Sequence, residues 1–193
     1  MVLNEKTVAV DTDFINHIAD TRMNIDDIIE NIKKLLEHFD VVAVIHPLVY
    51  QHEIDTSNTR LAKMFSEEVV HILELSDIFT GDPGERQYYI YLVREFYNSL
   101  RGESLSFSDD QIFTSWIRMR SLGEIHSVSM CLICGTGVFL SDDGDSKKLK
   151  TIVQQRQLGE IYVYNREEMK DEYRNTGGSS VSRKVLHKLT HEA

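Results

Sequence analysis

Short continuous apolar runs alternate along the chain with longer stretches in which apolar residues follow a helical spacing. The short runs are typical of strands buried on both faces. They lie at 7–11, 41–45 (VVAVI), 137–141 (GVFLS) and 160–165 (EIYVYN). From 24 to 39, isoleucines and leucines recur every three or four residues, which predicts an amphipathic helix with a charged outer face.

Further helices are predicted at 13–19, 48–54, 61–75, 85–100, 109–120, 122–134 and 145–154, with a short charged helix after the last strand. Buried strands that alternate with amphipathic helices predict an α/β fold with a mostly parallel, doubly wound sheet. The stretch from Ile45 to Val138, between the second and third of these strands, is too long for one crossover. We therefore expect a single domain at 1–172 that carries a helical insertion at about 57–120, followed by a basic tail or helix at 173–193.

Composition narrows the class of protein. The chain has 193 residues, of which 41% are hydrophobic, enough for one globular domain with a real core. No apolar run is long enough to span a bilayer and the N-terminus lacks the form of a signal peptide, so we expect a cytoplasmic protein with no membrane partner. The net charge of −10 argues against a broad phosphate-binding surface, but a metal-dependent nuclease remains compatible because metal-binding acids add negative charge.

Acidic residues gather where the predicted strands end. They are Asp11 and Asp13 after the first strand, Glu53 on the helix after the second, Glu124 at the start of the helix before the third, and Asp142, Asp143 and Asp145 after the third. Because ligands of open α/β sheets bind beyond the carboxyl ends of the strands, these four segments are expected to bring acids together. Clustered carboxylates need protons, bases or divalent cations as compensation, and Mg²⁺ and Mn²⁺ favour oxygen ligands.

These residues resemble the PIN domain family of metal-dependent nucleases. DTDFIN (11–16) is similar to the opening Asp-Thr/Ser-Asn/Asp-apolar-apolar motif of that family. The block LGEIHSVSMCLICGTGVFLSDDGDSKKL (122–149) resembles the Gly-Glu-x-Glu, helix, strand and Asp-Asp block of prokaryotic members. Glu53 stands where the second family acid would be, and EIYVY matches the closing strand. The resemblance covers 7–54 and 122–165, and its last block is the most specific part.

The resemblance implies a ribonuclease that cuts single-stranded or structured RNA with Mg²⁺ or Mn²⁺. The implied catalytic acids are Asp11, Glu53, Glu124 and Asp143, the implied metal ligands are Asp11, Glu124, Asp143 and Asp145, and the implied supporting residues are Thr12, Asp13, His126 and Asp145. His126 replaces the second acid of the Gly-Glu-x-Glu pattern. Either Glu124 takes that duty, His126 is a ligand or proton relay, or the site is weakened. The implied partners are an RNA substrate, an antitoxin or another protein, and a second copy of the chain; a toxin and an RNA-processing enzyme both fit.

Each candidate residue also has a structural interpretation. Asp11 and Asp13 could cap the following helix, and the acids at 142–145 could form a turn and a helix start. Glu53 could be a solvated helix acid, and Glu124 an acid favoured by the helix dipole.

Two other functions remain open from the sequence. Asp11-Thr12-Asp13 also resembles the Asp-x-Asp motif of haloacid dehalogenase-like phosphatases, although VVAVIHP ends without the expected Ser or Thr. A non-catalytic PIN-like binding or assembly module is the third reading, favoured by His126 and by the acidic body.

Overall fold

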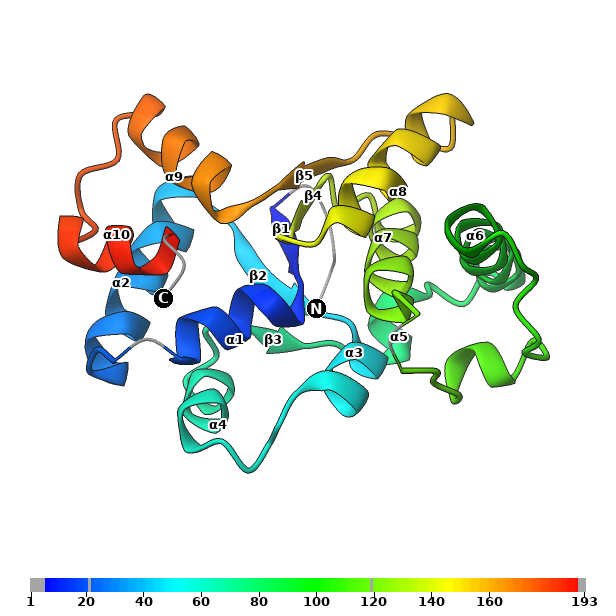
Figure 1. The fold of residues 1–193 in the computed structure, drawn as a ribbon, viewed down its shortest axis with the longest axis horizontal. Helices are drawn as coiled ribbons and strands as arrows, with labels where there is room; N and C mark the ends of the chain where they lie inside the picture. The colour runs from blue at the N-terminus through cyan, green and yellow to red at the C-terminus, as the bar shows by residue number, and fades with distance from the viewer. Residues whose placement is uncertain (1–5, 21, 119, 191–193) are drawn as a thin grey trace.

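A five-stranded, fully parallel sheet forms the centre of the computed structural model, which describes residues 6–20, 22–118 and 120–190 (Figure 1). Its strands are β1 (Thr7–Val10), β2 (Val42–Ile45), β3 (His71–Ile72), β4 (Val138–Leu140) and β5 (Tyr162–Tyr164). They lie in the order β3-β2-β1-β4-β5, so that Ala9 of β1 pairs with Val44 on one side and with Phe139 on the other. The predicted α/β class with a parallel sheet is confirmed.

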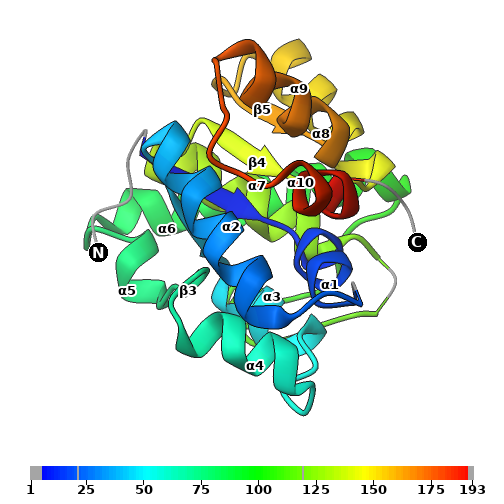
Figure 2. The same cartoon turned by 90° about the vertical axis from the view of Figure 1, so that its left-hand side faces the viewer.

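Helices cover both faces of this sheet (Figures 1 and 2). They are α1 (Thr12–Asp20), α2 (Ile25–Phe39), α3 (Pro47–Glu53), α4 (Thr59–Ser66), α5 (Leu75–Ile78), α6 (Pro83–Arg101), α7 (Leu122–Cys134), α8 (Gly144–Gln155), α9 (Arg166–Asn175) and α10 (Arg183–Thr190). The alternation of side chains along β1 divides the interior in two. Val8 and Val10 face a core shared with α1, α2, α4, α9 and α10, and Ala9 faces a core shared with α5–α8.

The predicted helix at 61–75 is wrong in its second half. The helix ends at Ser66, and Glu68 then adopts a left-handed backbone conformation with φ 54°, which a continuing helix does not allow. The β-branched pair Val69 and Val70 follows, and the chain runs on as β3. The segment at 57–120 is therefore not only helical, because it supplies one edge strand of the sheet.

The predicted helix at 109–120 is also wrong. Among the described residues 109–118 and 120, the helical structure is limited to a 3₁₀ turn at Gln111–Phe113. Its apolar side chains are nevertheless buried, since Ile112 and Phe113 belong to the core beside α6 and α7. The helical spacing therefore marked residues that pack inward without a helix, a case in which tertiary packing overrides local preference.

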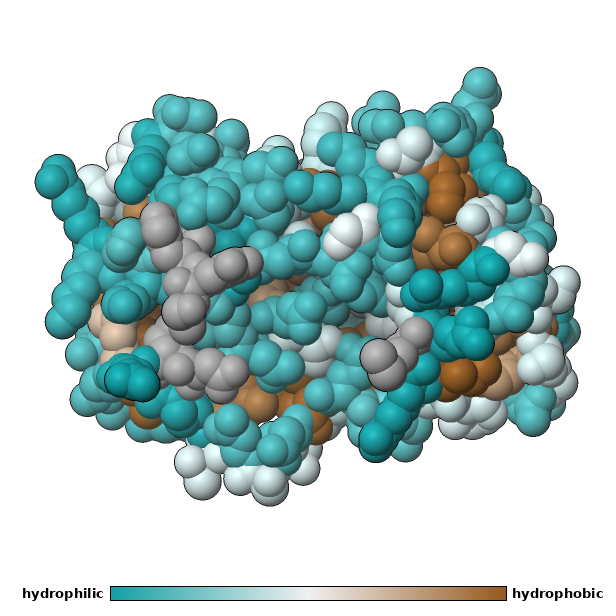
Figure 3. Space-filling view, viewed as in Figure 1, coloured by the Kyte–Doolittle hydropathy of each residue, from teal (hydrophilic) through white to brown (hydrophobic). Residues whose placement is uncertain are grey.

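The predicted tail begins inside a helix, because α9 extends to Asn175. Val181 and Val185 are buried as the amphipathic pattern indicates, whereas the side chain of Leu189 lies outside the described residues. Within the described part of the chain, no helix combines the length and apolar character that a membrane crossing needs. The face seen in Figure 3 is mostly hydrophilic, with small hydrophobic patches mainly around α6.

The order of the strands fixes where a ligand would bind. The chain leaves β1 toward β2 on one side, whereas it leaves β4 toward β5 on the other side. The connections after β1 and β4 therefore run in opposite directions, and in open α/β sheets the crevice at such a switch point is where ligands bind. Asp11 directly follows β1 and Ser141 directly follows β4, so both stand at this crevice.

Candidate functional site

Asp11 is the buried centre of the candidate site, with 2% of its surface exposed. Its carboxylate accepts a hydrogen bond from the Ser141 hydroxyl at 2.7 Å and another from the Thr12 backbone N–H at 2.7 Å. Burial raises the pKa of Asp11 to about 7; the Ser141 hydrogen bond lowers it, and the negative charges of Asp13 and Glu53 raise it further. Asp11 is therefore held in place by two donors but remains electrostatically strained.

Glu53, the last residue of α3, lies at the exposed rim of the same site. The Thr12 hydroxyl donates a hydrogen bond to its carboxylate, which links Glu53 to the start of α1. Gly123 in the first turn of α7 approaches closely, because a Cβ atom at this position would lie 2.8 Å from Glu53 Oε1. Partial burial raises the pKa of Glu53, the Thr12 hydrogen bond lowers it, and the charge of Asp13 raises it.

Glu124 belongs to the same electrostatic cluster from the side of α7. It is half-buried in the first turn of that helix. Burial raises the pKa of Glu124 to about 8, and the negative charges of Asp11, Asp143 and Glu53 contribute to the rise. A carboxyl group with this pKa holds a proton at neutral pH unless a positive charge is placed beside it.

Asp13 and the acids after β4 complete the cluster. Burial raises the pKa of Asp13, and the charges of Asp143 and Asp142 raise it further, whereas Arg166 lowers it. Asp143 caps α8 by accepting a 2.6 Å hydrogen bond from the backbone N–H of Asp145. Asp142 is instead paired with the Arg166 guanidinium and accepts the Arg166 backbone N–H at 3.1 Å. For Asp142, this pairing fits the structural interpretation of the acids at 142–145.

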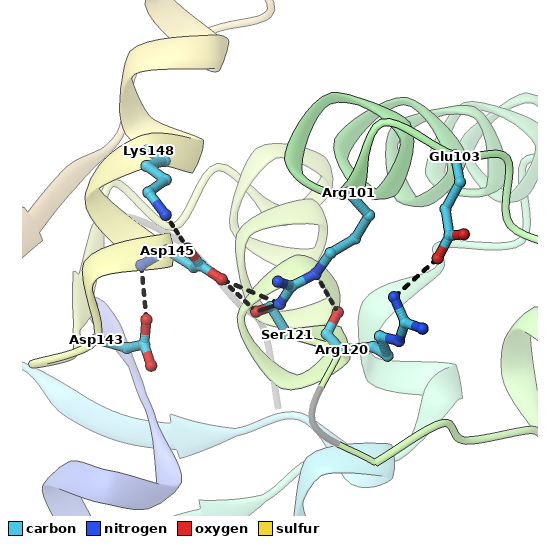
Figure 4. Close-up of polar contacts among 7 residues, drawn as sticks. All are labelled: Arg101, Glu103, Arg120, Ser121, Asp143, Asp145 and Lys148. Atoms are coloured by element: carbon cyan, nitrogen blue, oxygen red, sulfur yellow. Dashed lines mark hydrogen bonds and ion pairs between the residues drawn. The ribbon is translucent and has the colours of Figure 1, made fainter.

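The partners of the Asp145 carboxylate are basic and hydroxyl groups (Figure 4). Its carboxylate contacts Arg101 at 3.0 Å and Lys148 at 2.6 Å, and it accepts a hydrogen bond from Ser121 at 2.5 Å. Burial raises the pKa of Asp145, but the hydrogen bonds from Lys148 and Ser121 and both positive charges bring it below the ordinary value. Asp145 thus ties the start of α8 to the end of α6 and to the loop before α7.

His126 is buried, and its described contacts are with Tyr89, His46 and Trp116 and not with a carboxylate. Its Nδ1 lies 2.7 Å from the hydroxyl of Tyr89, and that hydroxyl lies 2.8 Å from Nε2 of His46. All three side chains are buried. Burial lowers the pKa of His126 to about 3, with a further contribution from His52, so the ring is neutral. The structure therefore places the predicted supporting residue His126 in a buried polar chain beside the acid cluster.

The structure brings six predicted residues to the crevice between β1 and β4. They are Asp11, Thr12, Asp13, Glu53, Glu124 and Asp143. In the ranges described, no Lys, Arg or His forms an ion pair with the five acids of this set. Also in these ranges, no three Asp, Glu, His or Cys side chains converge closely enough to hold a metal ion as they stand. The cluster is thus acidic and has no ion pair within the described ranges, although the charge of Arg166 acts on Asp13.

Three contributors were not expected from the sequence: Ser141, Arg166 and Tyr89. Ser141 had a usable signal, because a polar residue directly after a buried strand stands at the same edge as the acids. Arg166 holds the same position after β5. Nothing in the sequence distinguished Tyr89 as part of the site, because a series of aromatic residues such as that along α6 is typical of any helix packed in a core.

Comparisons with protein-family models, with curated proteins and with solved structures gave no match. The resemblance to the PIN family therefore rests on the sequence motifs alone.

Proposed function

We propose that the protein is a divalent-metal-dependent nuclease that hydrolyses phosphodiester bonds in RNA. The observation that carries this proposal is the meeting of carboxylates from four segments at the switch point of the sheet, with raised pKa values for Asp11 and Glu124. Such an arrangement is unfavourable by itself, and it gains stability when a cation is placed among the acids. Raised pKa values in a crevice are a common mark of functional sites, although ion-pair networks also produce them.

The donor chemistry of the site fits Mg²⁺ or Mn²⁺. Carboxylate oxygens are the preferred ligands of both ions, and Mg²⁺ is commonly held by only one or two carboxylates together with waters. Asp11, Glu124 and Asp143 would hold the ion. Asp145, which is committed to Arg101 and Lys148, supports the site by fixing the start of α8. When bound, a divalent ion supplies a more acidic water and neutralises charge that develops on the phosphate.

The residues of the chain orient and tune these acids. Ser141 and the Thr12 backbone N–H fix the Asp11 carboxylate from two directions, so that its oxygens cannot rotate freely. Glu53 faces solvent and is linked to the same segment by the Thr12 hydroxyl. Partial burial raises the pKa of Glu53, which makes its carboxylate a better acceptor for a proton released close to the reacting phosphate.

We expect purified protein to cut a mixed RNA pool in Mn²⁺ or Mg²⁺ but not in EDTA. Asp11→Asn and Asp143→Asn should each lower the cleavage rate at least tenfold, because each variant removes one anionic ligand with almost no change in shape. Asn also retains the capping function of residue 143, since Asn and Asp are both strong N-caps. A gel or fluorescence assay on labelled RNA measures the rates.

The matched control is Asp171→Asn. Asp171 is an exposed acid of α9 that pairs with Arg174 at 3.8 Å, so the variant changes the net charge equally without touching the crevice. It should cut RNA at the wild-type rate. Equal cutting by Asp11→Asn, or cutting that persists in EDTA, would show that the activity arises elsewhere and would refute the proposed site.

A non-catalytic binding module is the second candidate. It is favoured by the openness of the acid cluster, in which no three ligands converge within the described ranges, and by the inward orientation of His126. Titration calorimetry with Mn²⁺ separates the two functions. No heat of binding together with no cleavage supports the module, whereas binding lost in Asp11→Asn supports the nuclease. The phosphatase reading gains no support from the described contacts, and a covalent aspartyl-phosphate on Asp11 would be needed to restore it.

Gly123→Ala should lower the cleavage rate about three- to tenfold while the protein remains folded. The added Cβ would lie 2.8 Å from Glu53 Oε1, so the flexible carboxylate must move. Alanine is the better helix former by about 1 kcal/mol, which offsets the crowding in the unfolding free energy. Gly144→Ala at the start of α8 is the control, since no atom lies within 4 Å of its Cβ position. If both variants cut RNA at the same rate, the position of Glu53 does not matter for the reaction.

A further inference from the structure

A cavity of about 250 Å³ lies in the core between the sheet and the helices of one face. Two registered strand pairs form its floor, Val8 with Val138 and Val10 with Leu140. Side chains from α1, α2, α4 and α9 form the opposite wall. Figure 2 views these covering helices from outside. The cavity thus follows the direction of the strands for at least the length of two side-chain positions.

The lining of this cavity is almost entirely apolar. Among the described residues that line it, only Glu172, Thr176 and Tyr164 bring polar side-chain groups. The Thr176 hydroxyl already donates to the Glu172 carbonyl at 2.8 Å and lies 2.8 Å from Nε2 of His38. Ordered water needs two to four polar partners, so most of this space is unfavourable for water.

The position of the cavity limits the size of its occupant. Its walls are mainly core residues, including Ala43 with 3% and Met64 with 0% of their surface exposed, whereas Glu172 and Thr176 are exposed. A folded protein or a nucleic acid cannot contact such residues without unfolding the helices above them. Native cores are packed so closely that voids larger than a water molecule are few. A space of this volume is therefore suited to a small molecule.

We propose that this cavity is a binding site for an uncharged, mainly apolar molecule of the size of a substituted benzene or a short alkyl chain. A dry apolar cavity of about 150 Å³ is sufficient to bind benzene, and this one is larger. The Glu172 carboxylate at the polar end of the lining repels an anionic head group. An ammonium head group would lose its hydration inside the apolar walls, which excludes a buried cation.

The cavity lies directly beneath the acid cluster but does not depend on the nuclease proposal. Val10 and Phe14 line it, and they flank the segment that carries Asp11 and Asp13. A bound molecule would restore the dispersion contacts that these side chains lack toward the cavity, and would so stabilise the segment. Ligand binding can be measured through folding stability alone, without any cleavage assay.

The test is thermal unfolding in the presence of benzene, n-octanol or octanoate. At a concentration one hundred times the dissociation constant, benzene or n-octanol should raise Tm by about 5–10 °C, because only the folded protein binds it. Octanoate, which has the same chain length with a negative head group, should raise Tm much less. An equal effect of octanoate would contradict the uncharged class, and the absence of any shift with all three compounds would overturn the site.

Two alanines on opposite faces of the sheet provide the matched variants. Ala43 of β2 lines the cavity, whereas Ala9 of β1 faces the other core and is 0% exposed. Ala43→Leu should fill the space, raise Tm without ligand and abolish the effect of n-octanol. Ala9→Leu should lower Tm through overpacking and leave the effect of n-octanol intact. If Ala43→Leu lowers Tm as strongly as Ala9→Leu, or still responds to n-octanol, the proposed cavity is not the binding site.

Discussion

In buffer without divalent ions, the protein should lose roughly 4 kcal/mol of unfolding free energy as the pH rises from about 4 to about 8. The ordinary pKa of 3.8 applies to Asp11 in the unfolded chain, and burial raises it to about 7 in the folded protein. Between these values the folded protein retains a proton that the unfolded chain has released, so stability falls with rising pH. The displacement corresponds to roughly 4 kcal/mol, at about 1.4 kcal/mol for each pH unit.

Glu124 should act in the same direction. Its pKa rises from 4.5 to about 8, so its contribution to stability is present below about pH 4.5 and is lost as the pH approaches 8. Part of this rise comes from the charge of Asp11, and the two contributions are therefore not additive. Because the pKa of Glu124 is about 8, the loss of stability should continue above pH 7. Because the two contributions are not additive, the total loss should be less than twice the loss expected from Asp11 alone.

Urea unfolding at pH 5 and pH 8 measures this effect, once in EDTA and once in Mn²⁺. In EDTA, wild-type protein should be markedly less stable at pH 8, and Mn²⁺ should restore stability at pH 8 with little effect at pH 5. Asp11→Asn should flatten the dependence on pH, whereas Asp171→Asn should retain it. A wild-type protein with equal stability at both pH values in EDTA would show that burial does not raise the pKa values of Asp11 and Glu124 in solution.

The strands that position the site could be predicted because they are continuous and buried. All four predicted strands are present within one or two residues of their predicted ends. β3 could not be predicted in this way, since it has only two residues and continues directly from a stretch with helical spacing. Its place is decided by pairing with Val44 and Ile45 of β2, a contact between segments that local sequence does not encode.

The location of the candidate site could be predicted from the sequence, but the role of each acid in it could not. Any acid after a parallel strand reaches the crevice, which follows from topology alone. Which acid remains uncompensated depends on bases that arrive from distant segments. Arg101 reaches Asp145 across 44 residues of sequence, and Arg166 reaches Asp142 across 24. The sequence analysis therefore counted both Asp143 and Asp145 among the implied metal ligands, although only Asp145 is paired with Arg101 and Lys148.

Tyr89→Phe should destabilise the protein by roughly 2–4 kcal/mol although it removes a single oxygen atom. The buried hydrogen bonds that join His46, Tyr89 and His126 all run in one direction. The Leu48 backbone N–H donates to Nδ1 of His46 at 3.2 Å, so the proton of the neutral His46 ring lies on Nε2 and is donated to the Tyr89 hydroxyl. The Tyr89 hydroxyl proton is then available for Nδ1 of His126. Every step follows from one backbone donor at the start of α3.

Loss of the Tyr89 hydroxyl would leave Nε2 of His46 and Nδ1 of His126 without a partner in a site that water does not reach. His46 and His126 are both 0% exposed, and an unsatisfied buried polar group costs about 1–3 kcal/mol. Among the described residues, Nε2 of His126 already lacks a hydrogen-bond partner, so these three side chains have no spare hydrogen bond that could compensate. Protonation cannot relieve the defect near neutral pH, because burial holds the pKa of His46 well below its ordinary value and lowers that of His126 to about 3.

Tyr88→Phe is the matched control for urea unfolding. Tyr88 precedes Tyr89 on α6 but is 39% exposed and stacks on Tyr91 with 6.0 Å between ring centroids. Loss of its hydroxyl should change the unfolding free energy by less than about 0.5 kcal/mol. A Tyr89→Phe variant as stable as Tyr88→Phe would show that water or a shifted side chain satisfies both rings. The interior beside the acid cluster would then be wet, and His126 would be open to the proton-relay role that its buried position otherwise opposes.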